Sequence, residues 1–192
     1  MDGYENNNGK IMVAMDFRNV NTPLCEVAGD APKDYSVLRE TVLAGRPCNA
    51  VFAYDSLFRS GNRDQQQCTH DMLRDAGFTV RLSETPNKED KQGHVDVFMA
   101  LDVFRYVLNH DVDTVELITG DSDFHPLVKM LQDLGIKVRV WSFRSTLGQV
   151  YRMAADGVCY LDSVPMIEVR PVPSHEDASP VGEDVSVEEA AA

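Results

Sequence analysis

The sequence lacks any apolar run close to the roughly 20 residues that a membrane-spanning helix requires. Its opening stretch, MDGYENNNGK, also lacks the apolar segment of a secretory signal peptide. We therefore expect a soluble, cytoplasmic protein with no membrane partner. The cysteines form no C-x-x-C pair, which disfavours a zinc site or a disulfide framework and indicates reduced thiols. They are Cys25, Cys48, Cys68 and Cys159.

Basic residues are scarce, with 18 Lys and Arg against 31 Asp and Glu and a formal net charge of −13. This excess of acid argues against a broad, non-specific nucleic-acid coat. It does not exclude an enzyme that acts on nucleic acid, because carboxylates that hold a divalent metal ion themselves add negative charge. Part of the excess lies at the end of the chain, in EDASPVGEDVSVEEAAA, which begins at Glu176 and has no Lys or Arg.

Apolar runs alternate with amphipathic stretches along the chain, and this pattern predicts alternating strands and helices. We expect a three-layer α/β/α sandwich with a central, mostly parallel sheet. The 192 residues suit one such domain over 10–162, with a flexible N-terminus at 1–9 and a flexible acidic tail at 163–192. The predicted strands are 10–15, 48–56, 78–84, 114–120, 137–143 and 158–162, and the predicted helices are 34–45, 62–77, 95–109, 126–135 and 146–157.

Acidic residues stand directly after two of the predicted strands. Asp16 follows the first strand, with Asn19 in the loop behind it, and Asp121 and Asp123 follow the fourth strand in ITGDSDF. Ligands of parallel α/β sheets bind outside the carboxyl ends of the strands, so these side chains share a cleft if the two strands are neighbours. The alternatives are local: an Asx-turn at Asp16, and capping of the following helix by Ser122 or Asp123.

The predicted helix at 95–109 contributes further acids. Asp96 lies at its start, where a negative charge suits the helix dipole. Asp102 lies about a turn and a half further on, and its alternative role is an ion pair with Arg105 at i+3. Three acids from separate elements provide the hard oxygen ligands that Mg²⁺ or Mn²⁺ take. Such a site can activate water and stabilise a phosphoryl transition state.

Other catalytic patterns are missing from the sequence, which has no Gly-rich phosphate loop and no Ser–His–Asp arrangement near these acids. His94 and His125 flank the acids, and we interpret both as surface or capping residues. A phosphatase of the haloacid dehalogenase type needs a second Asp two residues after Asp16, where Arg18 stands. We therefore set that class aside.

Four segments resemble the NYN domain of LabA-like proteins, within the PIN-like nuclease superfamily. The similarity covers roughly residues 10–162, and the strand–GDSDF–helix–glycine–strand segment is its most specific part. The resemblance implies an α/β/α sandwich and a ribonuclease that uses Mg²⁺ or Mn²⁺ held by its acidic cluster. The four segments are VAMDFRNV, GHVDVFMALDV, ELITGDSDFHPLVKMLQDLGIKVRVWSF and LGQVYRMAADGVCYLD.

The resemblance also implies roles for individual residues. Those implied to be catalytic and to bind metal are Asp16, Asp96, Asp121 and Asp123. Those implied to support them are Asn19, Asp102 and Thr119, the last standing where many members have Ser. Our candidates for contacts with the RNA backbone, each of which has a solvated surface charge as its alternative, are Arg18, Arg59, Arg63, Lys88 and Lys91.

The predicted activity is metal-dependent cleavage of single-stranded RNA. A non-catalytic NYN module that binds RNA or a protein partner in a regulatory role remains the alternative. The sequence is compatible with a homodimer but does not indicate one.

Overall fold

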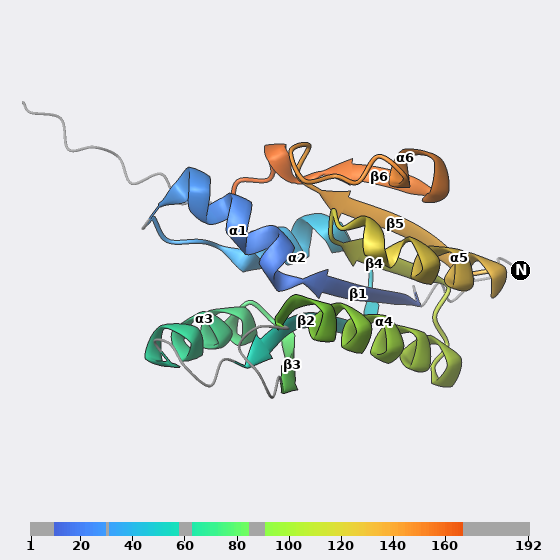
Figure 1. Ribbon diagram of the computed structural model, residues 1–192, viewed down its shortest axis with the longest axis horizontal. Coiled ribbons are helices and arrows are strands. Elements are labelled where there is room, and N and C mark those ends of the chain that lie inside the picture. Colours follow the sequence, from blue (N-terminus) through green and yellow to red (C-terminus); the bar gives the residue numbers. More distant parts are fainter. Residues whose placement is uncertain (1–9, 30, 58–62, 85–90, 167–192) are drawn as a thin grey trace, which may run out of the picture.

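Six parallel strands form a single sheet in the order β3-β2-β1-β4-β5-β6 (Figure 1). The structure is a computed structural model, and it describes residues 10–29, 31–57, 63–84 and 91–166. The prediction of an α/β fold with a mostly parallel sheet is confirmed. The strands are β1 (Ile11–Asp16), β2 (Cys48–Leu57), β3 (Thr79–Glu84), β4 (Thr114–Ile118), β5 (Lys137–Ser142) and β6 (Gly157–Tyr160).

Helices cover both faces of this sheet, so the molecule has three layers (Figure 1). The first three helices pack on one face and the last three on the other. Within the described ranges, no helix is both long and apolar enough to cross a membrane. The helices are α1 (Phe17–Ala28), α2 (Tyr35–Leu43), α3 (Arg63–Asp75), α4 (Lys91–Asn109), α5 (His125–Asp133) and α6 (Tyr151–Ala154), with short 3₁₀ helices η1 (Ser122–Phe124) and η2 (Leu161–Ser163).

The side chains of β1 alternate between the two apolar clusters of the core. Ile11, Val13 and Met15 belong to the cluster with α1 and α2, whereas Met12 and Ala14 belong to the cluster with α4 and α5. All five are buried. This is the pattern of a strand that is covered on both faces, as its continuous apolar run predicted.

β1 also marks the point where the strand order reverses, because β2 and β4 lie on its two sides. Its pairing with β4 runs from Ile11 opposite Thr114 to Met15 opposite Ile118. Asp16 therefore emerges from the same edge of the sheet as the residues that follow β4. Open α/β sheets bind ligands where the strand order reverses. The first and fourth strands are neighbours, which was the condition for a shared cleft.

α1 begins where the sequence predicted a loop. Phe17 enters the helix directly after Asp16, so the placement of Asn19 in a loop was wrong, and Asn19 lies in the first turn of α1. Phe17 and Leu24 are buried in the core. We attribute the persistence of the helix to this packing, since Pro23 inside it removes a backbone hydrogen bond.

Two other predicted helix boundaries were wrong. α4 begins at Lys91, so Asp96 lies in its second turn and not at its start. The dipole argument for Asp96 is thereby weakened, because the effect fades beyond the first turn. The helix predicted at 146–157 shrinks to the single turn of α6.

The packed domain extends past its predicted end at Asp162. Met166 is buried, and its carbonyl oxygen accepts a hydrogen bond from the Asp34 N–H at 2.7 Å. Val164 and Met166 therefore pack on the domain, although we assigned them to the tail. Residues 1–9 and 167–192, which we predicted to be flexible, lie outside the described residues.

Candidate active site

Asp16 lies at the carboxyl end of β1 with only 3% of its surface exposed. Its Oδ1 accepts a hydrogen bond from the Asn19 N–H at 3.4 Å, and its Oδ2 accepts one from the Thr119 hydroxyl at 3.3 Å. The bond from Asn19 caps α1, so a local turn role of the predicted kind is present. Neither donor carries a positive charge. Within the described part of the chain, the carboxylate therefore has partners for its oxygens but no cationic partner for its charge.

Thr119 and Asn19 join the ends of β1 and β4. Thr119 Oγ1 donates to Asp16 and accepts from the Asp121 N–H at 3.1 Å. Asn19 Oδ1 accepts from the Gly120 N–H at 2.7 Å. Two of the three residues predicted to be supporting thus contact the backbone or side chains near the predicted acids. Their functional role remains a prediction.

Asp121 caps η1, because its Oδ1 accepts a hydrogen bond from the Asp123 N–H at 3.0 Å. The alternative considered for this segment, capping of the following helix by Ser122 or Asp123, is wrong. η1 intervenes before α5, and α5 has no side-chain cap. The side chain of Asp121 therefore caps η1 and also belongs to the candidate site.

Tyr151 contacts the candidate site, although the sequence analysis did not single it out. It is fully buried, and its hydroxyl donates to the carbonyl oxygen of Asp121. Burial, followed by the charges of Asp121 and Asp123, raises the pKa of this hydroxyl and keeps it a donor. Nothing in the sequence marks this tyrosine, since one within an apolar helical pattern is ordinarily a core residue.

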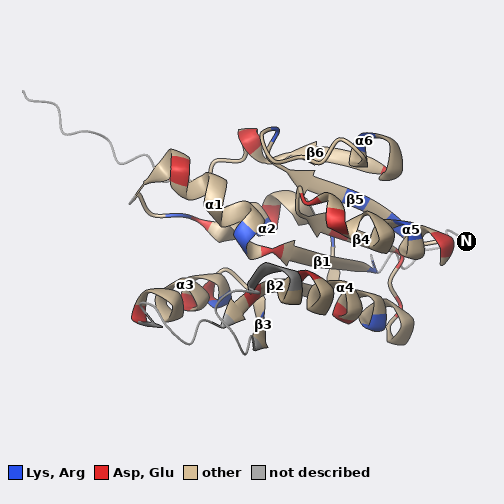
Figure 2. Ribbon diagram, in the orientation of Figure 1, with Lys and Arg blue, Asp and Glu red and all other residues tan. Residues whose placement is uncertain are grey.

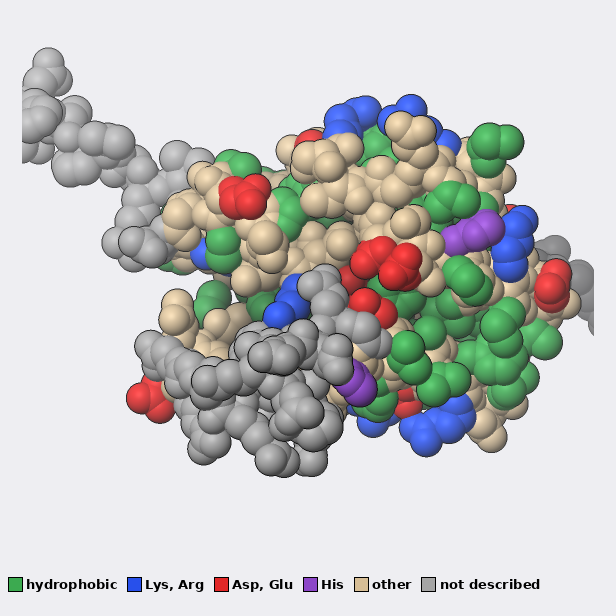
Figure 3. Space-filling model, in the orientation of Figure 1, with side chains coloured by type: hydrophobic (Ala, Val, Ile, Leu, Met, Phe, Trp, Pro, Cys, Tyr) green, Lys and Arg blue, Asp and Glu red, His purple; other side chains and the backbone are tan. Residues whose placement is uncertain are grey.

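Burial and mutual repulsion raise the pKa values of two acids in this region. Burial, followed by the charges of Asp96 and Asp121, raises the pKa of Asp16 to about 7 against the lowering effect of its hydrogen bonds. Burial, followed by the charges of Asp121 and Asp123, raises the pKa of Asp96 to about 6. These four acids form one electrostatic unit, which we call the acidic cluster. Figure 2 marks acidic positions in red on the ribbon at the end of β1, and Figure 3 shows acidic side chains gathered between α4 and α5.

The donor chemistry of the acidic cluster fits Mg²⁺ or Mn²⁺, which take carboxylate and water oxygens. A divalent cation would also relieve the repulsion that raises the pKa values of Asp16 and Asp96. Among the described residues, however, no three His, Cys, Asp or Glu side chains are arranged to hold one ion together. The cluster has the composition of a metal site, and its set of ligands remains a prediction.

Asp102 forms its contacts with residues outside the acidic cluster. It is buried, and it accepts hydrogen bonds from the Tyr54 hydroxyl at 3.0 Å and from Arg105 at 2.6 Å. Arg81 Nε lies 3.6 Å from its Oδ2. The ion pair with Arg105 that the sequence offered as the alternative is therefore present. A supporting role for Asp102 in catalysis stays a prediction.

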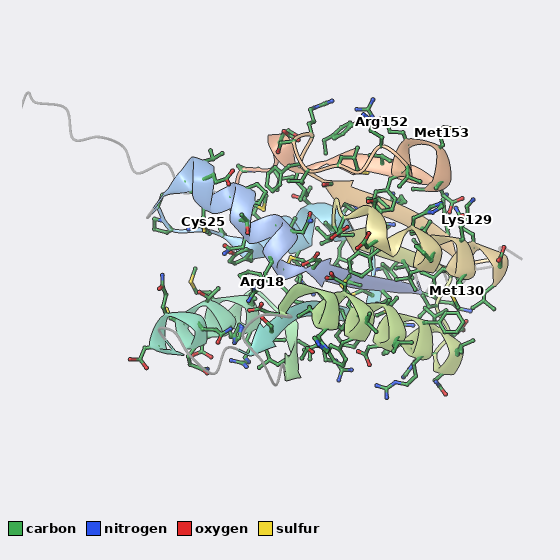
Figure 4. The ribbon with its side chains drawn as sticks, viewed as in Figure 1. Arg18, Cys25, Lys129, Met130, Arg152 and Met153 are labelled. Carbon is green, nitrogen blue, oxygen red and sulfur yellow. The ribbon has the colours of Figure 1, made fainter. Side chains whose placement is uncertain are left out.

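Arg18 lies in the first turn of α1 (Figure 4), and its side chain donates to Asp55 Oδ1 at 3.1 Å and to Ser56 Oγ at 2.6 Å. His70 Nε2 contacts Asp55 Oδ2 at 2.9 Å. Burial by itself would raise the pKa of Asp55, but its hydrogen bonds with His70, Arg18 and the Ser56 amide hold that pKa below the usual value. Arg18 also lowers the pKa of Asp96, so its charge reaches the acidic cluster.

The remaining candidates for contacts with RNA are not described by the structure. Arg59 and Lys88 lie outside the described residues. Arg63 and Lys91 begin α3 and α4, but their side chains also lie outside the described part. A role for these four residues remains a prediction from sequence.

The fold and the acidic cluster together define a class of protein, an α/β/α sandwich with acidic side chains at the point where its strand order reverses. Residues 10–162 match the model of the NYN domain, and the chain belongs to the NYN domain family. Membership implies the PIN-like nuclease superfamily, and NYN domains are generally nucleases. The predicted family is confirmed, whereas the LabA-like subfamily stays a prediction.

Similar proteins add support for the fold. A crystal structure of a protein of unknown function, VPA0982 from Vibrio parahaemolyticus, has a TM-score of 0.68 and 27% sequence identity. That match covers 85% of this chain and 98% of the other. The uncharacterized protein MJ0482 of Methanocaldococcus jannaschii is 42% identical over 48 residues, which is 25% of this chain and only 20% of that protein's length.

Proposed function

We propose that this protein is a metal-dependent ribonuclease that hydrolyses phosphodiester bonds of single-stranded RNA at the acidic cluster. Membership in the NYN family supports a nuclease activity. The position of the cluster at the reversal of strand order supports a binding site. The choice of RNA and the use of Mg²⁺ or Mn²⁺ are parts of the proposal.

The observation that carries the proposal is the environment of Asp16. The buried acids of the described part are Asp16, Asp55, Asp102 and Glu116. Arginines form ion pairs with the last three, whereas Asp16 has no Lys or Arg partner among the described residues. A buried carboxylate without a counter-charge is unfavourable in its ionised form. A divalent cation is a counter-charge that suits such a position.

The residues proposed to hold the cation are Asp16, Asp96 and Asp121, with Asp123 as a further ligand or a close neighbour. The chemistry that such an ion supplies when bound is the activation of water and the compensation of charge that develops on the phosphodiester. These acids come from the ends of β1 and β4 and from α4. The site therefore depends on the correct assembly of the sheet.

The chain's own residues orient these acids. Thr119 and Asn19 donate to the two oxygens of Asp16, and Asn19 also accepts from the backbone after β4. The Tyr151 hydroxyl donates to the carbonyl group of Asp121, and the Asp123 N–H donates to the Asp121 side chain. The side chains of Asp16 and Asp121 thus accept hydrogen bonds from neutral donors, which supports a role for their charge in binding a cation.

The test is a cleavage assay with purified protein, a fluorescent single-stranded RNA and either Mg²⁺ or Mn²⁺. We expect cleavage that EDTA abolishes and that Asp16→Asn and Asp121→Asn each reduce by roughly 100-fold or more, since even outer-sphere partners of a metal site contribute about 10- to 100-fold. Asp133→Asn, which changes an exposed acid on α5, is the matched control and should cleave normally. The proposal fails if folded wild-type protein cuts no RNA with either metal, or if both site variants cut at the wild-type rate.

A non-catalytic module that binds RNA or a protein is the alternative function. Calorimetric titration with Mn²⁺ distinguishes the ribonuclease from the non-catalytic module. Only the ribonuclease requires a Mn²⁺ site that Asp16→Asn and Asp121→Asn weaken. Tight RNA binding in EDTA, with no heat of Mn²⁺ binding and no cleavage, would favour the alternative.

A further inference from the structure

A hollow of about 400 Å³ lies beside the acidic cluster, between α1 and α3 at the end of β2. This volume falls within the range of sites that hold small molecules. Phe17 lines the hollow and follows Asp16 directly in the chain. Arg18 also lines it, and the charge of Arg18 acts on Asp96. The hollow therefore adjoins the acidic cluster.

Amide and hydroxyl groups dominate the lining of this hollow. An amide carries a donor and an acceptor side by side, which matches the donor–acceptor patterns on the edges of nucleobases. Tyr35 donates to Asn21 Oδ1 at 2.7 Å, and this bond orients the Asn21 amide. The amide and hydroxyl residues of the lining are Asn21 and Thr22 from α1 and Gln65, Gln66 and Thr69 from α3.

The charges at the base of the hollow disfavour a phosphate group as its occupant. Arg18 forms an ion pair with Asp55, which also lines the hollow. A phosphate that approached Arg18 would therefore meet the negative charge of Asp55. A neutral heterocycle with hydrogen-bonding edges meets no such repulsion.

We infer that the hollow is a base-recognition subsite, which binds one nucleobase of the single-stranded RNA next to the phosphodiester at the acidic cluster. The Gln65 and Asn21 amides contact the edge of that base. This inference rests on the proposed ribonuclease function and adds a sequence preference to it. The enzyme then cuts RNA with a preferred base at one position relative to the cleaved bond.

Gln65 and Gln67 offer a matched pair of variants on α3. Gln65 lines the hollow, whereas Gln67 donates to Asp71 of the same helix at 2.9 Å and does not line it. The full-length wild type, Gln65→Ala and Gln67→Ala are each incubated with RNA that is randomised around the cut, and the products are sequenced. We expect a preferred base at one position for the wild type and for Gln67→Ala. We expect Gln65→Ala to weaken that preference by roughly tenfold, the size of discrimination that one good base contact provides.

An RNA with an abasic nucleotide at the preferred position completes the test. Wild type and Gln65→Ala should cut this RNA at similar rates, because the contact that distinguishes them is missing. The inference is overturned if the wild type cuts RNA but Gln65→Ala keeps the same base preference. It is also overturned if the two proteins differ as much on the abasic RNA.

Failure of the proposed function gives a different result, namely no cleavage of any RNA by the wild type. In that case the subsite is tested by fluorescence anisotropy with labelled single-stranded RNA octamers of each base. Binding that differs among the four octamers for wild type and Gln67→Ala, and not for Gln65→Ala, supports base recognition. Equal profiles for all three proteins overturn it.

Discussion

The buried carboxyl of Asp16 holds its proton more tightly in the folded chain than in the unfolded chain. Burial, followed by the charges of Asp96 and Asp121, raises its pKa from 3.8 to about 7. Between about pH 4 and pH 7 the folded chain keeps a proton that the unfolded chain releases, so the free energy of unfolding falls as the pH rises through that window. In metal-free protein, ionised Asp16 therefore destabilises the fold by on the order of 2 to 4 kcal/mol.

Asp16→Asn removes this ionisation and keeps an acceptor for the Asn19 N–H, because Asn caps helices about as well as Asp. In EDTA at about pH 8 we expect the variant to exceed the wild type in free energy of unfolding by roughly 1 to 3 kcal/mol. Its stability should also change less between about pH 5 and pH 8. Urea unfolding at several pH values measures both quantities, with Asp133→Asn as the control that follows the wild type. A variant that is less stable at pH 8 and just as pH-dependent would contradict the raised pKa of Asp16.

The turn from β4 into η1 is an element whose backbone approaches a neighbouring loop closely. A Cβ atom added to Gly120 would lie 2.2 Å from the carbonyl oxygen of Thr146 and 2.5 Å from Ser142 Oγ. The Gly148 N–H also donates to the Gly120 carbonyl at 2.7 Å. The loop after β5 thus fixes the backbone immediately before Asp121.

Gly120→Ala should force this backbone apart. We expect a loss of roughly 2 to 3 kcal/mol in the free energy of unfolding, in the range of overpacked cores, and slower RNA cleavage because Asp121 is displaced. Gly157→Ala is the control, since a Cβ there would meet only Arg139 side-chain atoms at 3.5 and 3.6 Å. Urea unfolding and the cleavage assay give the two readouts. Wild-type stability in Gly120→Ala would show that the close approach to Thr146 does not constrain the turn.

Elements with a continuous apolar run were predictable from sequence, and elements that depend on tertiary packing were not. The run Lys10–Met15 predicted β1 to within one residue. α1 escaped prediction because Pro23 and its polar neighbours hide the buried stripe of Phe17 and Leu24. In the same way, the length of α6 depends on its contacts and not on the local pattern.

In the candidate site, too, some features were predictable from sequence and others depended on tertiary packing. The positions of Asp16 and Asp121 were predictable, because residues at or just after the end of a buried strand lie at the carboxyl edge of the sheet. The hollow was not predictable, because nothing in the sequence distinguishes Asn21 and Gln65 from other polar residues. They come together only because the order β3-β2-β1 places α1 and α3 next to each other. Tyr151 escaped for the same reason, since its contact with Asp121 joins residues on different elements.

At the scale of the whole molecule, the order of the strands creates the site. Thr119 and Asp16 are 103 residues apart in sequence, yet they share a hydrogen bond because β1 and β4 are neighbours. α4 then brings Asp96 within electrostatic reach of both strand ends. A negative centre results, in a chain whose formal net charge is already −13.

This net charge opposes the approach of a polyanion such as RNA. Residues 176–192 contribute acids and no Lys or Arg, and loss of that segment reduces the net charge from −13 to −7. The acids in question are Glu176, Asp177, Glu183, Asp184, Glu188 and Glu189. We therefore expect these charges to slow the association of RNA with the acidic cluster, most strongly at low ionic strength.

Deletion of residues 176–192 should raise kcat/KM for single-stranded RNA several-fold at about 20 mM salt, where charges interact over on the order of 20 Å. The difference from the wild type should vanish near 0.5 M salt, where screening acts within a few ångströms. A full-length chain with Gln at the six acidic positions is the control that separates charge from length, and it should behave like the deletion. Cleavage rates of the three proteins measured across this salt range test the prediction. Equal kcat/KM values for all three proteins at low salt would mean that the acidic segment does not repel the substrate, and an increase confined to the deletion would assign the effect to chain length instead of charge.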